Sequence, residues 1–109
     1  MTRREIAHSI ANFCVWKNRP ILQRAAKTGM PLESFRYFLR SVRDSLDEFS
    51  RNAKQRGHAE ECPELFDPIS DALTMINFAL SKTPIDGEAI KAALESLDEC
   101  AAELELAPA

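Results

Sequence analysis

Glycine and cysteine are both scarce in this chain of 109 residues, and neither forms a known motif. The three glycines, Gly29, Gly57 and Gly87, stand far apart, so there is no glycine-rich phosphate-binding loop. The three cysteines, at positions 14, 62 and 100, form no C-x-x-C pair. An odd number at such spacing argues against a disulfide framework and a zinc site. We expect reduced thiols, with Cys14 packed as an apolar residue and Cys62 the most exposed.

Histidine is equally scarce, which limits the chemistry that the chain can perform. Glu5 and His8 form a single Glu-x-x-His motif, whereas di-iron bundles need two such motifs and two further glutamates. His58 lies near Cys62, but one histidine and one cysteine are too few for a closed zinc site. No pairing of a nucleophile with a base stands out. We therefore expect no metal, no cofactor and no enzymatic activity.

Long apolar runs and alternating patterns are absent as well. No segment approaches the roughly 18 consecutive apolar residues that a membrane span needs. The stretch 6–16 is interrupted by polar residues and is too short to serve as a signal peptide. We expect a cytoplasmic protein that does not contact a membrane. Alternation of apolar and polar residues is missing throughout, so we predict no strands.

Helical spacing is what the sequence does contain, beginning at its N-terminus. Thr2 and Glu5 fit a capping box, in which each side chain satisfies a free backbone N–H group. The apolar residues that follow at helical spacing are Ile6, Ala7, Ile10, Phe13 and Cys14. Pro20 lacks an N–H group and crowds the preceding turn. We therefore expect the first helix to be broken or kinked near Asn18, with a second piece reaching Thr28.

The strongest pattern lies in residues 31–56. Pro31 suits the first turn of a helix, where its missing N–H group costs little. The apolar residues then alternate at spacings of three and four, as in a heptad seam: Leu32, Phe35, Leu39, Val42, Leu46, Phe49 and Ala53. Gly57 follows this seam as a stop signal. The longest helix of the protein is predicted here.

Two further helices are predicted after an acidic linker over residues 60–67, in which Pro63 could begin a helical turn. Asp67 and Pro68 read as the cap and first residue of one helix, and Asp86 caps the last. Their apolar positions are Ile69, Leu73, Ile76 and Leu80, then Ile90, Leu94, Leu97, Ala101 and Leu104. Residues 107–109 are expected to fray. Four amphipathic helices with short connections predict an all-α fold, an antiparallel four-helix bundle forming a single domain over residues 1–109.

Charge is divided unequally between the two halves of the chain. Residues 1–57 carry 12 Lys or Arg and 5 Asp or Glu, a net +7, whereas residues 58–109 carry 2 and 12, a net −10. In the 31–56 helix five of the basic residues share one face: Arg36, Arg40, Arg43, Arg51 and Lys54. This face is either a binding surface for phosphates or an acidic protein, or it pairs internally with the acidic half.

Several large apolar residues miss the predicted seams. Val15 and Trp16 lie off the stripe of the first helix, and Met75 and Phe78 lie opposite the stripe of theirs. Phe38 sits at the edge of the long seam. Such residues indicate either a helix buried on two sides or a surface that meets a partner. We expect Trp16 to belong to the core, and leave both alternatives open for Met75 and Phe78.

These patterns predict a small helical protein-interaction module, acting as an adaptor, inhibitor or chaperone-like regulator. The expected partner is another protein or a second copy of the chain. The candidate partner-binding residues are Met75, Phe78, Arg36, Arg40, Arg43 and Trp16. The alternative is a nucleic-acid-binding protein that uses the basic face of the 31–56 helix, although the net charge of −3 weighs against it.

Overall fold

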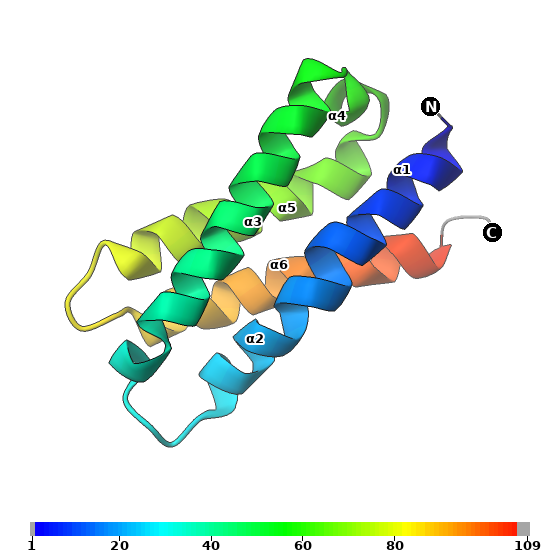
Figure 1. Cartoon of the computed structure of the whole chain (residues 1–109). Coiled ribbons are helices and arrows are strands. Elements are labelled where there is room, and N and C mark those ends of the chain that lie inside the picture. The colour runs from blue at the N-terminus through cyan, green and yellow to red at the C-terminus, as the bar shows by residue number, and fades with distance from the viewer. Residues whose placement is uncertain (1, 107–109) are drawn as a thin grey trace.

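The computed structural model of this protein describes residues 2–106, with side chains up to residue 104 (Figure 1). The elements are α1 (Arg3–Ile10), the π-helical turn η1 (Ala11–Val15), α2 (Trp16–Lys27), the 3-10 turn η2 (Leu32–Phe35), α3 (Arg36–Gln55), α4 (His58–Glu61), α5 (Pro63–Leu80) and α6 (Gly87–Leu106). No strand occurs within residues 2–106, which confirms the all-α prediction for that part. The expected fraying of residues 107–109 lies outside the described residues. None of the described helices has the length and apolar character needed to cross a bilayer.

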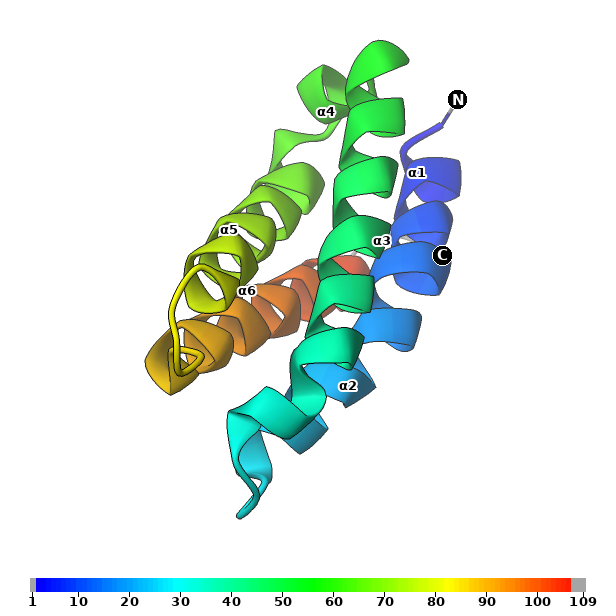
Figure 2. The ribbon, with the colours of Figure 1, turned by 60° about the vertical axis from the view of Figure 1, so that its left-hand side comes forward.

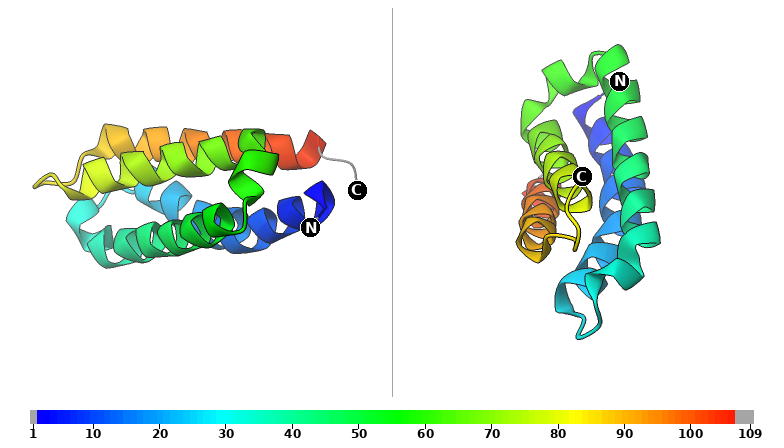
Figure 3. Two further views of the ribbon diagram at one scale, coloured as in Figure 1. Left: turned by 90° about the horizontal axis from the view of Figure 1, so that it is seen from above. Right: turned by 90° about the vertical axis from the view of Figure 1, so that its left-hand side faces the viewer.

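The helices are arranged in two layers. Figure 3 shows α1, η1 and α2 running beside α3 in one layer, with α5 beside α6 in the other. Figure 2 shows the same two pairs from a second direction. The change of layer falls at the end of α3, close to the sequence position at which the charge changes sign. The basic half of the chain therefore forms one layer and the acidic half forms the other.

Local capping places most helix ends where the sequence predicts them. The Thr2 side chain accepts from the backbone N–H of Glu5, which completes the predicted capping box. The Asp86 carboxylate accepts from the N–H groups of the second and third residues of α6, at 3.0 and 3.3 Å. Gly57 has a φ of 77°, a left-handed conformation that ends α3 and that glycine adopts without steric cost.

The predicted break near Asn18 is wrong, because α2 continues through Pro20. The irregularity lies one turn earlier, in η1, where the N–H of Trp16 donates to the carbonyl of Ala11, five residues back. Pro20 stands inside α2, where it donates no backbone hydrogen bond but does not end the helix.

The wide turn of η1 also changes which side chains face the core. Buried residues recur every four positions: Ile6, Ile10, Cys14, Asn18 and Leu22. In an ideal α-helix each such step would rotate the stripe by about 40°, and the extra residue in η1 absorbs part of that drift. As a result Val15 is 3% exposed, whereas Phe13 is 58% and Trp16 is 67% exposed. The predictions that Phe13 lies on the core stripe and that Trp16 belongs to the core are therefore wrong.

The predicted seam is buried along α3, but the predicted helix start at Pro31 is wrong, because residues 32–35 form the 3-10 turn η2 and α3 begins at Arg36. Leu39, Val42 and Leu46 are fully buried, and Phe35 and Phe49 pack against the core from its edges. The beginning of α5 differs from the prediction, because the helix starts at Pro63 and contains Pro68 in its interior. Pro63 takes the first helical position that the sequence suggested for Pro68. The predicted linker 60–67 is therefore mostly helical, because it holds the end of α4 and the first residues of α5.

Candidate partner-binding surfaces

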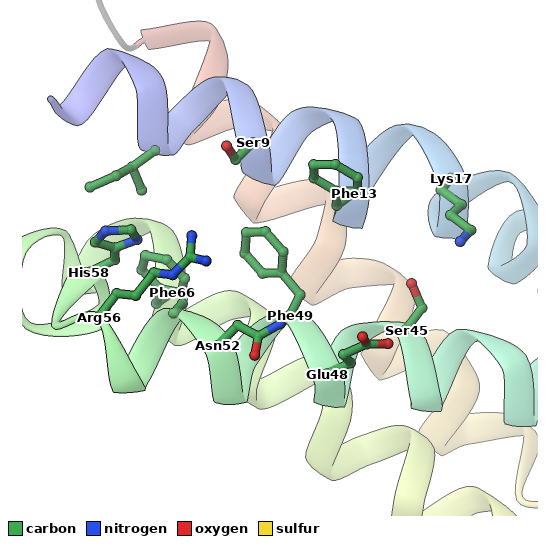
Figure 4. A pocket seen from close by; sticks show the side chains of 12 residues that line it. Ser9, Phe13, Lys17, Ser45, Glu48, Phe49, Asn52, Arg56, His58 and Phe66 are labelled. Atoms are coloured by element: carbon green, nitrogen blue, oxygen red, sulfur yellow. The ribbon is translucent and has the colours of Figure 1, made fainter. Parts of the chain in front are cut away.

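A pocket of about 410 Å³ opens between the α1–η1–α2 segment and α3 (Figure 4). Its apolar wall comes from both sides of this groove and from α5 in the other layer. The apolar lining residues are Ile6, Phe13, Phe49, Ala53 and Phe66. Side chains from three separate parts of the chain therefore build the pocket, and no local motif in the sequence indicates it.

Three aromatic rings cross the pocket from the core to the surface. The ring centroids of Phe66 and Phe49 are 6.1 Å apart with planes 15° from parallel, and those of Phe49 and Phe13 are 6.2 Å apart at 28°. Phe66 is buried and Phe49 is half-buried, whereas Phe13 is exposed. Each ring packs against the next, from Phe66 to Phe49 to Phe13. The exposed ring of Phe13 is therefore connected to the apolar core through Phe49 and Phe66.

Polar side chains occupy the two ends of the pocket. Figure 4 shows Lys17, Ser45 and Glu48 at one end and Arg56 and His58 at the other. Glu48 is the one carboxylate among the residues that line the pocket, so the end formed by Arg56 and His58 has the positive charge of Arg56 and no acidic lining residue. Within the described side chains, no ion pair involves Lys17, Arg56 or His58.

Met75 and Phe78, which the sequence suggested as one binding surface, differ in their exposure and in their neighbours. Met75 is half-buried, packs against the core and lines a shallow groove between α5 and α6. Phe78 is 47% exposed, and the Lys82 ammonium lies 4.9 Å from the centroid of its ring. Met75 therefore has a packing role within the chain, and Phe78 is the more accessible of the two.

Arg36 holds together two distant segments of the chain. Its guanidinium donates to both carboxylate oxygens of Glu33, at 2.6 and 2.7 Å, and to the carbonyls of Leu80 and Lys82, at 3.1 and 3.2 Å. Glu33 also accepts from the N–H of Ile85 at 3.2 Å. The hydrogen bonds from Arg36 hold the pKa of Glu33 below its ordinary value. Arg36 thus fastens the end of α5 to the start of α3.

The other predicted residues lie on separate elements. Arg43 pairs with its neighbour Asp44 at 3.1 Å, and Arg40 is exposed on α3. Trp16 is exposed at the start of α2. The six predicted residues are therefore spread over α2, α3 and α5, and their role in binding a partner stays a prediction. Residues of the pocket such as Phe13, Arg56 and His58 were not among them.

Pairing between the two charged layers is limited. Among the described side chains, Arg3 with Glu64 and Arg19 with Asp98 are the ion pairs that join the layers. The Arg19 Nε and Asp98 Oδ1 atoms are 2.7 Å apart and shielded from solvent, and their contact lacks hydrogen-bond geometry. On α3, by contrast, Arg36, Arg43 and Arg51 pair with acidic residues of their own half. Internal pairing therefore leaves much of the opposite charge on the two layers unpaired.

The cysteines are all buried and free, so the prediction of an exposed Cys62 is wrong. Burial raises the pKa of Cys14 far above its ordinary value and that of Cys100 to about 12, with further contributions from Cys100 and Glu103 respectively. Such thiols stay protonated and are poor nucleophiles at neutral pH.

Within the described residues no three His, Cys, Asp or Glu side chains lie close enough together to hold a metal ion.

Comparisons with protein families, with curated proteins and with solved structures found no match to this chain.

Proposed function

We propose that this protein is an interaction module that binds a segment of another protein and has no catalytic activity of its own. The observation that carries this proposal is the pocket beside Phe13. A protein that keeps a large aromatic side chain exposed next to an aromatic-walled pocket has a ready site for an apolar anchor of a partner. The three cysteines are buried, so none of them is a ready nucleophile at the surface.

Another protein suits this role better than a second copy joined through the heptad seam. The seam residues Leu39, Val42 and Leu46 are fully buried within one chain, so they offer no surface for dimerisation. Light scattering at low and high salt tests this point, and we expect the mass of a monomer at both. A dimer at both salts would favour self-association through another surface, such as the one around Phe78.

The scaffold that we propose is an antiparallel four-helix bundle forming one domain over residues 1–109. Its four long members are α1–η1–α2, α3, α5 and α6, and the arrangement in two layers supports it.

We also propose a cytoplasmic location. Three free, buried thiols support a reducing compartment, because oxidising compartments favour disulfide bonds.

A displayed library of randomised helical peptides tests the proposed function without a known partner. We expect selection against the wild-type protein to enrich peptides with a large apolar residue, and Phe13→Asp to abolish their binding. Phe13 is exposed, so the variant should fold, and circular dichroism checks this. Tyr37→Asp is the matched control, since Tyr37 is an exposed aromatic residue outside the pocket. Phe78→Asp tests the surface first predicted from the sequence.

Two results would count against this proposal. A library that yields no binders would remove the support for an interaction module. Binders that survive Phe13→Asp but are lost with Phe78→Asp would move the interaction to the surface on α5 around Phe78.

Nucleic-acid binding through α3 is the second candidate. Arg40, Arg51 and Lys54 are exposed on this helix, and the layer that contains it is basic. Binding to phosphates would weaken steeply as salt rises. Fluorescence anisotropy with duplex and single-stranded oligonucleotides at low salt is the test. An absence of binding to both probes would eliminate this candidate.

A further inference from the structure

We infer that the pocket beside Phe13 selects acidic segments, in which a carboxylate lies about two helical turns from the apolar anchor. This inference rests on the proposed function and adds the chemistry of the partner. The observations that carry it are the unpaired Arg56 and His58 at one end of the pocket, the aromatic wall beside them and the charge of the layer in which the pocket lies.

The geometry of α3 sets the spacing between anchor and carboxylate. Phe49 and Arg56 both line the pocket and are seven residues apart on or next to this helix. Seven residues correspond to about 10 Å along a helix axis. A helical ligand lying along the groove, with its anchor against Phe13 and Phe49, would place a residue seven positions away close to Arg56. Figure 4 shows the aromatic pair in the middle of the pocket and Arg56 at its end.

The polar groups also set the direction of the ligand. Glu48 lines the end near Lys17 and would repel a carboxylate there, whereas no acidic residue lines the end near Arg56 and His58. Arg56 can bind a carboxylate through two parallel hydrogen bonds, and the imidazole of His58 supplies a further donor. The carboxylate of the ligand therefore belongs at the Arg56 end.

The charge of the whole layer favours the same ligand. Most residues that line the pocket belong to the half of the chain that carries a net +7, and the two from the other half, His58 and Phe66, are not acidic. The ion pairs with the acidic layer involve Arg3 and Arg19, which do not line the pocket. An acidic segment would approach an attractive field and a basic one a repulsive field. Charge complementarity thus identifies the occupant as an acidic amphipathic helix of a partner protein.

The peptide library tests this inference when its selected sequences are read for charge as well as for apolar content. We expect Asp and Glu to be enriched at least threefold over Lys and Arg, chiefly seven residues from the anchor. Selection against Arg56→Glu should reverse this preference. Lys54→Glu is the matched control, because it makes the same change of charge on the same helix outside the pocket.

Affinities of one selected peptide complete the test. We expect Arg56→Glu to weaken binding of this peptide at least tenfold and Lys54→Glu to weaken it less than threefold. When the acidic residue seven positions from the anchor of the peptide is changed to its amide, we expect Arg56→Glu to have no further effect on binding. Binders enriched in apolar residues without a charge preference would overturn this inference and leave the proposed function standing. Equal effects of the two charge reversals, or displacement of the peptide by a single-stranded oligonucleotide, would also overturn it. A library without binders would instead defeat the proposed function itself.

Discussion

Asn18 on α2 and Ser45 on α3 are joined by a hydrogen bond of 3.4 Å from Nδ2 to Oγ. The same Nδ2 donates to the carbonyl of Phe13 at 3.2 Å, within the irregular turn η1. The Asn18 side chain is itself only 1% exposed, and both of its bonds are partly buried. One buried amide therefore links the π-helical turn to the neighbouring helix.

Removing this amide should destabilise the protein. We expect Asn18→Ala to lower the free energy of unfolding by about 1–3 kcal/mol, because the Phe13 carbonyl loses a donor and a small cavity remains. Urea denaturation measures the change. Asn52→Ala is the matched control at an exposed position, with an expected change within about 0.5 kcal/mol. Equal stability of the two variants would contradict the structural role of Asn18.

The neighbours Val15 and Trp16 offer a direct test of the register that η1 sets. Val15 is buried and Trp16 is exposed, opposite to what the size of the two side chains suggests. We expect Val15→Ala to cost about 1–3 kcal/mol of unfolding free energy and Trp16→Ala to change it by less than about 0.5 kcal/mol. Thermal or urea unfolding of the two variants checks this. A larger loss for Trp16→Ala would mean that Trp16 belongs to the core after all.

The pair formed by Glu33 and Arg36 should make stability depend on pH in the acid range. Hydrogen bonds from Arg36 lower the pKa of Glu33 from the ordinary 4.5 in the folded state. The unfolded chain therefore binds a proton first as pH falls, so the contribution is present above about pH 4.5 and is lost as pH drops through the folded pKa. We expect Glu33→Gln to destabilise the protein at pH 7 and to have little effect near pH 3. A difference independent of pH would contradict the ion pair.

The three cysteines should be protected in the folded protein. All are buried, and the raised pKa values of Cys14 and Cys100 keep these thiols neutral at pH 8. We expect an aromatic disulfide reagent to react slowly with the native protein and rapidly with all three thiols in denaturant. Rapid reaction of one thiol in the native protein, identified by peptide mass, would show that its site opens.

Their pKa values also predict a loss of stability at alkaline pH. Cys14 and Cys100 ionise at higher pH in the folded protein than the ordinary value of 9. Their contribution to stability is therefore complete below about pH 9 and decreases above it, as the unfolded chain releases these protons first. Urea midpoints measured between pH 8 and 11 should fall, and replacement of Cys100 by alanine should reduce the slope. A flat profile would contradict the burial of these thiols.

The residues whose roles were predicted most reliably from the sequence are those that begin or end helices through local backbone conformation or hydrogen bonds. Thr2, Gly57 and Asp86 mark helix ends as expected, because each one satisfies or replaces backbone hydrogen bonds within a few residues. The seam through Leu39, Val42 and Leu46 was also correct, because its spacing follows from the geometry of a single helix. Pro63 and Pro68 were harder to separate, since both fit the first turn of a helix and only one can begin it.

The sequence by itself thus determined that the chain is helical in the described part, where most helices end, and that charge divides at about residue 57. Only the tertiary structure decided that Phe13 faces outward and Val15 inward, because the π-helical turn η1 shifts the buried stripe relative to a regular α-helix. The tertiary structure also formed the pocket, because it brings together Phe13 of η1, Phe49 of α3 and Phe66 of α5. Helix periodicity describes one helix at a time, whereas a pocket between helices depends on the register in which they meet.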